Sequence, residues 1–449
     1  MNPYLGHTEE ERQQMLQALG VSSIDELFAA IPEELRTRGD LPIPKALTEP
    51  ELLRLACERA AQNTPGAGPR AFLGAGIYEH MIPSVINHLA GRGEFLTAYT
   101  PYQPEASQGV LQAFFEFQTM VCELTAMPIA NASLYDGSTA LAEAAIAALA
   151  AGGSSRKKII VAGAVHPQYR QTLESYLVNL PYEISIAPMK DGCVDLEALR
   201  GMLGDVAAVA VQSPNYFGLI EDMPAISEAV HGEGADLISV FEPISLGLLA
   251  APGEYGADIA VGEGQPLGLS PYLGGDTVGL FACTQEYMRR MPGRLVGEAV
   301  DRHGKTGYVL ALQTREQHIR REKATSNICT NQGLNALKAA IFMSAMGPQG
   351  LREMAEAWTV NAHVLVEKLK QKAGAKEAFP GPFFGECVLR FGTDAQALHT
   401  RLLEQGFVAG VPLTDVLPEM PDALLLCATE TKTEQDMDVL VDVITTNVC

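Results

Sequence analysis

The tetrapeptide Asp136-Gly137-Ser138-Thr139 opens an alanine-rich segment that ends at Gly152-Gly153. Because glycine commonly follows the last turn of a helix, this pattern predicts a helix that starts at the tetrapeptide. Free N–H groups and the helix dipole favour an anion at such a start, and Ser138 and Thr139 are the candidate phosphate ligands. The alternative is simple capping by Asp136, whose negative charge does not attract a phosphate.

Two more polar side chains follow apolar, strand-like runs. His166 comes after the run 158–162, and Glu242 follows the run 237–241. Ligands of open α/β folds bind at the carboxyl ends of the strands, so both residues are candidates for contact with a cofactor. A hydrogen-bonded loop histidine and a satisfied strand-end carboxylate are the plainer alternatives.

The run Tyr99-Thr100-Pro101-Tyr102-Gln103-Pro104-Glu105 contains two prolines and is therefore expected to be extended. Such a segment would present the side chains of Tyr99, Tyr102, Gln103 and Glu105. They could line a substrate site, where tyrosine and carboxylate groups fix an amino group, or they could form a clamp between domains.

Residues 289–323 form a basic island in an acidic chain. The island has nine lysine or arginine residues and four acidic residues, whereas the whole chain has a formal net charge of −22. One interpretation is a solvated helix face with pairs such as Glu316–Arg320. The other is a surface that captures a carboxylate, a phosphate or an acidic protein. We favour a role at an interface with a partner.

The composition limits the classes of function. The chain has 449 residues, of which 47% are hydrophobic and 19% charged, as in globular proteins with a sizeable core. Its negative charge argues against nucleic-acid and anionic-membrane partners, and its apolar runs are too short to span a bilayer. Eight scattered cysteines without a CxxC pair predict reduced thiols in the cytoplasm and no metal site.

An α/β scaffold is expected to position these residues. Residues 1–70 read as an acidic helical arm, with capping-box spacing at Thr8–Glu11 and Thr48–Glu51. Residues 71–310 alternate helices with short apolar strands, which predicts a large domain with a mostly parallel sheet. Residues 311–449 read as a small α+β C-terminal domain. The strands of the large domain are predicted at 158–162, 184–188, 206–212, 237–241 and 258–261.

Several runs are specific enough to carry a family resemblance. Besides the Tyr99–Glu105 run they are Leu73-Gly74-Ala75-Gly76, Asn131-Ala132-Ser133-Leu134, Met291-Pro292-Gly293-Arg294-Leu295-Val296-Gly297 and Arg321-Glu322-Lys323-Ala324-Thr325-Ser326-Asn327-Ile328-Cys329-Thr330. Together they resemble the P-protein of the glycine cleavage system, the decarboxylating glycine dehydrogenase. The resemblance extends over essentially the whole chain and is narrowest to the amino-terminal half of that protein, which some prokaryotes encode as a separate α subunit, or subunit 1.

The resemblance implies a fold, a cofactor and partners. The implied fold is that of the pyridoxal phosphate (PLP)-dependent transferases of the aspartate aminotransferase type, fold type I. The implied cofactor is PLP, bound covalently to a lysine of a β subunit (subunit 2), and the implied assembly is an α2β2 heterotetramer. Glycine would lose CO2, and its aminomethyl group would pass to the lipoyl arm of an H-protein. The same motifs nominate Arg294, Arg321, Lys323 and Asn327 as substrate or interface residues.

One residue that the resemblance requires is missing from this chain. No lysine lies between Lys190 and Lys305, and the turn after the run 257–261 holds Gln265 and Pro266 instead. Without an amine no Schiff base with PLP can form. Ser138, Thr139, His166 and Glu242 are therefore expected to be vestiges of a cofactor site.

Two rival functions stay open at this point. A self-sufficient PLP-dependent aminotransferase or decarboxylase would have to use Lys190, in an expected turn, or Lys305, well past the expected position. A non-catalytic scaffold subunit would bind its partner without touching the chemistry.

Overall fold

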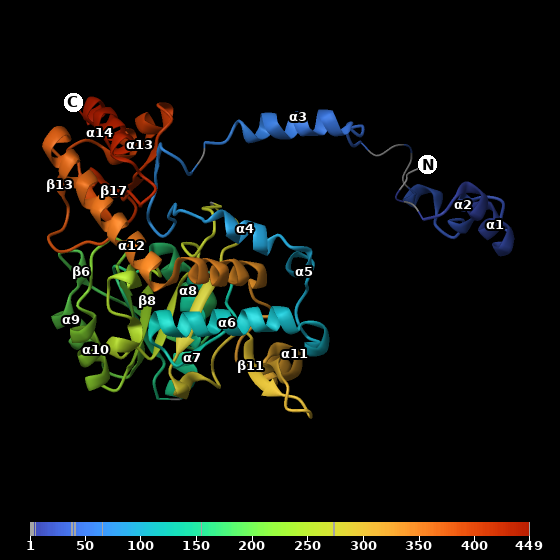
Figure 1. Ribbon diagram of the computed structural model, residues 1–449, viewed down its shortest axis with the longest axis horizontal. Coiled ribbons are helices and arrows are strands. Elements are labelled where there is room, and N and C mark those ends of the chain that lie inside the picture. The colour runs from blue at the N-terminus through green and yellow to red at the C-terminus, as the bar shows by residue number, and fades with distance from the viewer. Residues whose placement is uncertain are drawn as a thin grey trace. The chain divides into compact units, whose positions relative to one another are not determined.

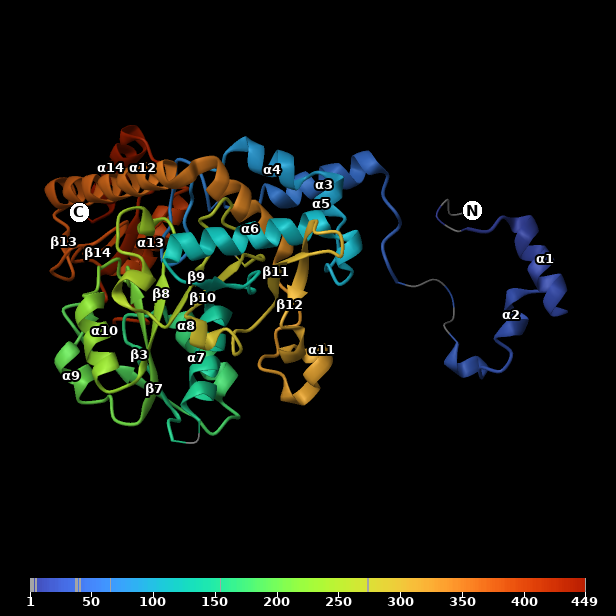
Figure 2. The same ribbon diagram turned by 60° about the horizontal axis from the view of Figure 1, so that its bottom comes forward.

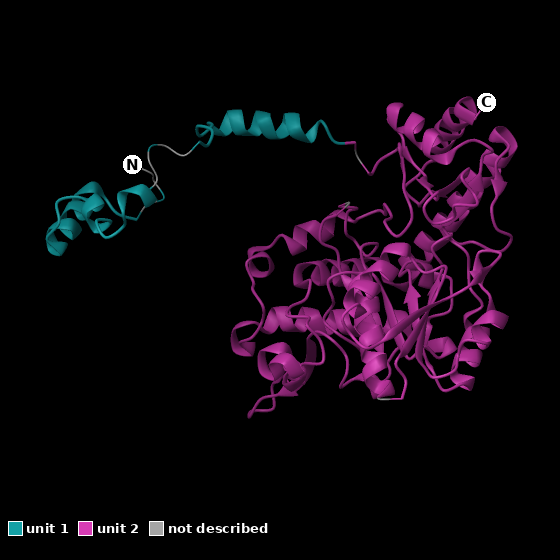
Figure 3. Cartoon of the chain, turned by 180° about the vertical axis from the view of Figure 1, so that it is seen from behind, with its two compact units in different colours: residues 1–63 teal, residues 64–449 magenta. Residues whose placement is uncertain are grey.

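The computed structural model describes residue 4 and residues 6–36, 39, 42–64, 66–153, 155–272 and 274–448. Its internal contacts divide the chain into two compact units, residues 1–63 and residues 64–449 (Figure 3). The predicted domain boundaries at residues 70 and 310 stay predictions.

The smaller unit is helical, as its sequence predicts. Its α-helices are α1 (Glu9–Leu19), α2 (Ile24–Leu27) and α3 (Glu49–Ala60). Thr8 caps α1, because its hydroxyl accepts a hydrogen bond from the Glu11 N–H at 3.2 Å while the Glu11 carboxylate accepts one from the Thr8 N–H at 2.7 Å. Glu51 accepts from the Thr48 N–H at 2.8 Å in the same way. Both predicted capping boxes are confirmed.

The larger unit is built on a seven-stranded sheet of order β2-β10-β9-β8-β7-β3-β4 (Figure 1). The neighbours from β9 to β4 are parallel, whereas β10 runs antiparallel to both β9 and β2. The strands are β2 (Ile129–Ala130), β3 (Lys158–Ala162), β4 (Glu183–Ala187), β7 (Val206–Ser213), β8 (Asp236–Phe241), β9 (Ile259–Glu263) and β10 (Gly279–Cys283). The five predicted strands are confirmed to within two residues.

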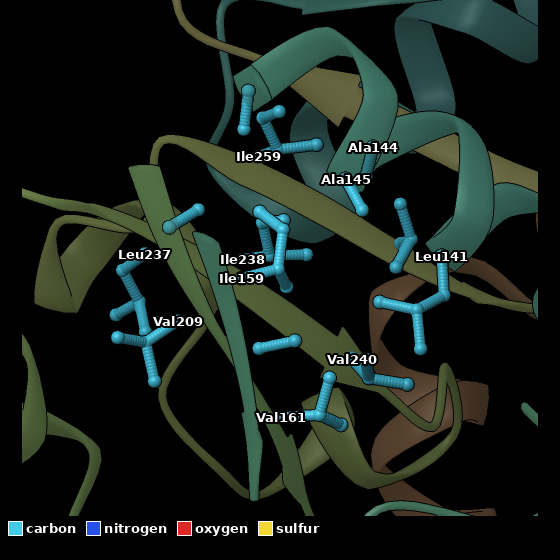
Figure 4. Packing of buried hydrophobic residues seen from close by; sticks show 14 of the residues in the cluster. Leu141, Ala144, Ala145, Ile159, Val161, Val209, Leu237, Ile238, Val240 and Ile259 are labelled. Atoms are coloured by element: carbon cyan, nitrogen blue, oxygen red, sulfur yellow. The ribbon is translucent and has the colours of Figure 1, made fainter. Parts of the chain in front are cut away.

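The sheet separates two hydrophobic cores. Successive side chains of a strand point to opposite faces; thus Ile259 and Val261 of β9 belong to one core and Ala260 to the other. The first core also contains Leu141 and Ala144 of the alanine-rich helix α7, which packs on the sheet (Figure 4). The small alanine side chains let this helix lie close to the strands.

The second core lies between the sheet and two long helices, α6 and α12, which run side by side (Figure 2). Helix α12 is interrupted at Gly347, whose backbone has φ 62° and ψ 179°. The helices of this unit before its small domain are α4 (Ser84–Ala90), α5 (Gly93–Leu96), α6 (Gln108–Thr125), α7 (Gly137–Gly152), α8 (Pro167–Leu177), α9 (Leu196–Arg200), α10 (Met223–Gly232), α11 (Gln317–Arg320) and α12 (Gly333–Ala373).

The C-terminal part adds a four-stranded antiparallel sheet of order β13-β14-β17-β16. Its elements are β13 (Lys376–Glu377), β14 (Glu386–Arg390), α13 (Ala395–Glu404), β16 (Val411–Pro412), β17 (Ala423–Cys427) and α14 (Glu434–Val448). A short strand β1 (Ala71–Phe72) pairs in parallel with β15 (Val408–Ala409). The chain segment that follows residue 70 is thereby tied to the C-terminal part by a separate two-stranded sheet.

Two hairpins complete the unit. One joins β5 (Met189–Lys190) to β6 (Cys193–Val194), and the other joins β11 (Leu295–Val300) to β12 (Thr306–Ala311). Two of the nine basic residues of the island, Arg302 and Lys305, lie in the second hairpin, and the others are spread over loops, 3-10 turns and the four-residue helix α11. The interpretation of that island as one helix face is therefore wrong. The Arg320 side chain donates to the Thr314 carbonyl at 3.1 Å, and the Glu316 carboxylate lies 3.6 Å from Nδ1 of His318. The expected side-chain pair of Glu316 and Arg320 is absent from the ion pairs of the described residues.

Candidate functional site

The site begins at the glycine-rich loop after β1, which is held against the small sheet. A Cβ atom on Gly74 would lie 2.2 Å from Oε2 of Glu386, so only glycine fits there. Glu386 accepts hydrogen bonds from the Ala75 N–H at 2.8 Å and from the Tyr78 hydroxyl at 2.7 Å. Burial raises the pKa of Glu386 to about 7. The loop is thus fixed by a buried carboxylate.

Gln265 closes the other side of the same loop. Its side chain is buried, with a relative exposure of 1% for the residue. The amide oxygen accepts from the Tyr78 N–H at 3.1 Å, and the amide nitrogen donates to the carbonyls of Tyr78 at 2.9 Å and Leu269 at 2.7 Å. This residue stands where the missing lysine is expected, two residues after the end of β9. Its amide is engaged by the protein backbone at both ends.

The start of α7 is occupied by two carboxylates of the chain itself. Asp136 accepts from the Thr139 N–H at 2.8 Å, so the predicted cap is confirmed. Glu263, at the end of β9, accepts from the Gly137 N–H at 3.0 Å, from the Gln265 N–H at 2.9 Å and from the Thr277 hydroxyl at 3.1 Å. Burial raises the pKa of Glu263 to about 7.

His166 is a buried, neutral histidine. Its Nδ1 accepts from the Gln168 N–H at 3.2 Å, so Nε2 carries the proton and donates to the Ala75 carbonyl at 2.9 Å. The ring stacks on Tyr169 with centroids 4.9 Å apart. Burial lowers the pKa of His166, which keeps it uncharged. The structure therefore shows it as a hydrogen-bonded loop residue.

Glu242 is a satisfied strand-end carboxylate. It accepts from the N–H groups of Ile244 at 3.0 Å and Ser245 at 2.6 Å, just beyond β8. Burial raises its pKa to about 7. The carboxylate is turned back onto its own backbone.

A cavity of about 540 Å³ is lined by some of these groups. Ser138 and His166 line it, as do Asp136, Glu263 and Gln265, whereas Thr139 and Glu242 are outside its described lining. That lining also contains no lysine and no arginine. Lys190 and Lys305, the two possible anchors of a self-sufficient enzyme, are both exposed residues of hairpins elsewhere.

A second cluster forms around Arg294, which is buried with a relative exposure of 1%. Its guanidinium donates to Thr330 Oγ1 at 2.9 Å, Asn331 Oδ1 at 3.3 Å, the Cys329 carbonyl at 2.8 Å and the Tyr102 hydroxyl at 3.0 Å. All four acceptors are neutral, and no acidic side chain lies within ion-pair distance in the described part of the chain. The sequence motifs that hold Tyr102 and Arg294 thus meet in space, 192 residues apart.

The four candidate residues of the Tyr99–Glu105 run are at the surface, whereas Pro101 is buried. Tyr99 is 86% exposed and Tyr102 48% exposed. Tyr99 lines a cavity of about 230 Å³ together with Thr330 and Asn331, and a neighbouring cavity of about 750 Å³ together with Tyr102 and Gln103. Glu105 is exposed and lines neither cavity.

Two of the nine basic residues of the island are internal supports. Arg294 is one, and Arg315 is the other: it is 9% exposed and donates to the carbonyls of Met291 and Gly293. Arg321, Lys323 and Asn327 lie exposed in the loop before α12, outside the lining of the three cavities described here. Arg321 has φ 55° and ψ −124°, a conformation that side chains other than glycine seldom adopt.

In the described part of the chain no cluster of three or more histidine, cysteine, aspartate or glutamate residues could hold a metal ion. Among the same residues, none of the helices combines the length and the apolar character that crossing a bilayer requires.

Three residues that shape the first cavity are not identified from the sequence: Glu263, which lines it, and Glu386 and Tyr78, which hold the adjoining loop at Ala75. Glu386 contacts Tyr78 across 308 residues, and Glu263 contacts Gly137 across 126 residues. No spacing in the sequence signals such contacts. The one local signal was the position of Glu263 between two glycines, Gly262 and Gly264, at the end of a strand.

Comparison with known proteins gives a consistent family. A model of the glycine cleavage system P-protein family matches residues 2–444. Relatives named probable glycine dehydrogenase (decarboxylating) subunit 1 occur in Geobacillus kaustophilus (strain HTA426) and Desulfitobacterium hafniense (strain DSM 10664 / DCB-2). Each is 48% identical to this chain, over 443 and 439 residues respectively, and each alignment covers 98% of both proteins.

Solved structures confirm the expected fold class. A crystal structure of glycine decarboxylase (P-protein) of the glycine cleavage system, in inhibitor-bound form, superposes with a TM-score of 0.90 and 44% identity, covering 99% of this chain and 100% of that chain. Glutamate decarboxylase of Lactobacillus brevis superposes with a TM-score of 0.69 at 15% identity, covering 94% of this chain and 97% of its own. The chain has the α/β fold of type I PLP-dependent enzymes, with a large, mostly parallel sheet and a small α+β part.

Proposed function

Because the chain belongs to the glycine cleavage system P-protein family, we propose that it is subunit 1, the α subunit, of a glycine dehydrogenase (decarboxylating). Its proposed partners are a β subunit that carries PLP on a lysine, and a lipoyl-bearing H-protein. The assembly is an α2β2 heterotetramer that decarboxylates glycine and transfers the aminomethyl group to the lipoyl arm.

The observation that carries this proposal is the hydrogen-bonded amide of Gln265. PLP enzymes need an amine at this place to hold the cofactor covalently. Here the Gln265 amide bridges the backbone of Tyr78 and Leu269. The place expected for the lysine is therefore taken by a side chain that holds the protein backbone together. PLP does not fit the residues of this cavity, since no lysine or arginine lines it in the described part of the chain. This supports the proposal that the chemistry takes place on another chain.

The contribution that we propose for this chain is a wall of the partner's site. Tyr102 accepts a hydrogen bond from Arg294, so its own hydroxyl proton is free to be donated outwards. The positive charge behind it strengthens that donor. Tyr102, Tyr99 and Gln103 are exposed side by side around one cavity. Such a surface can orient the carboxylate of glycine, and covering it by the partner excludes water.

The chemistry is assigned by reconstituting the two subunits with PLP and reducing the complex with borohydride. Digestion and mass spectrometry then locate the pyridoxyl group. We expect it on a lysine of the partner and not on Lys190 or Lys305 of this chain. Glycine–bicarbonate carbon exchange should require both subunits. A pyridoxyl label on this chain, or exchange by this chain alone, would establish the self-sufficient enzyme instead.

A second experiment separates a wall from a scaffold. Tyr102→Phe removes one hydroxyl from the exposed surface, and Tyr182→Phe removes one from a tyrosine that lines none of the cavities described. We expect Tyr102→Phe to lower the exchange rate at least tenfold while the tetramer still assembles, with Tyr182→Phe unchanged. Gln103→Ala and Glu105→Gln extend the comparison. Full activity of all these variants would favour the scaffold.

A further inference from the structure

The helix start that offers an anion site in this fold is already neutralised here. The N–H groups in the first turn of helix α7 have no partners within the helix, and such groups can bind a phosphate. Two of those groups are taken: Gly137 N–H donates to Glu263, and Thr139 N–H donates to Asp136. Both acceptors are carboxylates of the chain.

We propose that the carboxylate of Glu263 is a built-in substitute for a phosphate group, and that it makes the pocket of this chain reject phosphate-bearing ligands. This goes beyond the proposed function, because it concerns what the pocket of this subunit binds, whichever chain carries the cofactor. Glu263 is thus a specificity-determining residue.

The geometry of Glu263 supports this assignment. Its two oxygens accept three hydrogen bonds, from a backbone N–H of the helix start, from a backbone N–H of the next turn and from the hydroxyl of Thr277. A helix-start amide, a loop amide and a hydroxyl are the donors that commonly surround a bound phosphate. A single carboxylate of the chain therefore satisfies a complete donor set.

The close approach of the two elements is also built into the backbone. A Cβ atom on Gly137 would lie 2.2 Å from the hydroxyl oxygen of Tyr169 and 2.9 Å from the Glu263 nitrogen. Glycine at this position therefore lets the end of β9 pack directly on the start of α7. The contact between Glu263 and the helix is a consequence of that packing.

Electrostatics around the cavity act in the same direction. The described lining contains the carboxylates of Asp136 and Glu263 and no lysine or arginine. His166 is neutral and donates its Nε2 proton to the Ala75 carbonyl. A phosphate that entered would meet two negative groups without a cation to offset them, and like charges at this range repel strongly where water is scarce.

The test uses the full chain and the variant Glu263→Ser, which removes the carboxylate and leaves a small hydroxyl donor. Binding of inorganic phosphate, PLP and pyridoxal is measured by calorimetry at about pH 8, above the raised pKa of Glu263 of about 7. Circular dichroism checks that each variant is folded. Hydrogen exchange of peptides that cover the start of α7 locates the bound anion.

We expect phosphate and PLP to bind Glu263→Ser at least tenfold more tightly than the wild type, with new exchange protection at the start of α7. Pyridoxal, which lacks the phosphate, should show no such gain. The matched control is Glu242→Ser, which removes another buried carboxylate that accepts two backbone N–H groups but lies outside the cavity lining. It should gain no affinity.

Equal phosphate binding by the wild type and Glu263→Ser would overturn the proposal, as would a folded variant without any gain. If Glu263→Ser does not fold, Glu263→Gln replaces it, because glutamine keeps the shape of the side chain and removes the charge. Glu263→Gln must then also bind phosphate and PLP more tightly than the wild type, by a smaller factor. None of these results depends on a partner. A failure of the glycine exchange assay would therefore not contradict this inference. A failure of the phosphate-binding test would likewise not contradict the proposed function.

Discussion

At the scale of single residues, Arg294 is a buried charge that needs several hydrogen-bond acceptors from the surrounding structure. Its buried charge has four neutral acceptors, and its Nε has no described partner. An uncompensated buried charge is costly unless its hydrogen bonds are satisfied. The planar guanidinium can reach Tyr102, Cys329, Thr330 and Asn331 at once because its donors point in fixed directions. These contacts join the Tyr99–Glu105 run to the segment before α12.

Replacing Arg294 by lysine keeps the charge and removes that geometry. We expect Arg294→Lys to lower the free energy of unfolding by roughly 2–4 kcal/mol, as for a broken buried polar network. Chemical denaturation measures the change. Arg352→Lys is the control: Arg352 is 60% exposed and pairs with Glu356 at 2.9 Å, and its replacement should cost about 0.5 kcal/mol or less. Similar losses in both variants would show that the buried network adds nothing specific.

At the scale of elements, α12 packs in two cores, and its break at Gly347 lies within the stretch that packs in the first. Phe342 before Gly347 and Leu351 after it both belong to the core under the large sheet, while Leu365 and Leu369, further along the helix, pack against the small sheet. The backbone of Gly347 lies in a region that is almost restricted to glycine. Pro348 follows it, which cannot continue the preceding hydrogen-bond ladder.

Gly347→Ala therefore tests the break by itself. Around both Gly347 and Gly109 an added Cβ atom meets nothing within 4 Å, so neither substitution causes a clash. Gly109 lies in the regular helix α6, where alanine should stabilise by roughly 0.5–1 kcal/mol. Gly347→Ala should destabilise by about 1–3 kcal/mol because of its backbone conformation alone. Thermal or urea unfolding compares them, and equal effects of the same sign would contradict the argument.

Elements also show how far the sequence predicts this fold. The five parallel strands and the capping boxes are confirmed because apolar runs and Thr-x-x-Glu spacing are local signals. The hairpin β11–β12 is missed because the charged residues around it favoured an interpretation as a helix face, although its strands hold a single charged residue, Glu298. Strands β2 and β10 are absent from the prediction as well. They lie at the antiparallel edge, where a two-residue strand such as Ile129–Ala130 has no periodicity to detect.

The residues of the candidate site likewise divide into those with a local signal in the sequence and those without one. Ser138 and His166 are placed at the cavity by their positions at the ends of predicted elements. Glu263 and Glu386 could not be assigned, since their partners are far away in the sequence and depend on the tertiary packing. The roles of Tyr99, Gln103, Glu105, Arg321, Lys323 and Asn327 stay predictions.

On the scale of the whole molecule, the acidic chain encloses several carboxyl groups. Burial raises the pKa of Glu143, Glu242, Glu263 and Glu386 to about 7, above the ordinary value of 4.5. Such a group stabilises the fold while it is protonated in both states, and this contribution is lost as the pH rises from 4.5 through about 7. The buried His166 acts in the opposite sense, because its lowered pKa favours the fold at higher pH.

A single substitution isolates one of these groups. Glu386→Gln can keep the hydrogen bonds to Ala75 and Tyr78 without an ionisable proton. We expect the free energy of unfolding to fall less steeply in this variant than in the wild type between about pH 5 and pH 8, by roughly 2–3 kcal/mol over the range. Urea unfolding at several pH values measures it, and taking the difference cancels the contribution of His166. Parallel curves would show that Glu386 does not titrate in this window.

The contact between Glu263 and Gly137 also bears on whether the folding stability of this chain depends on the supply of a cofactor. A fold that is completed by a vitamin-derived molecule gains stability only in proportion to the supply of that molecule. A side chain tethered to the polypeptide is present at a constant, high effective concentration. We therefore expect this chain to reach its full stability whether or not the cofactor is present.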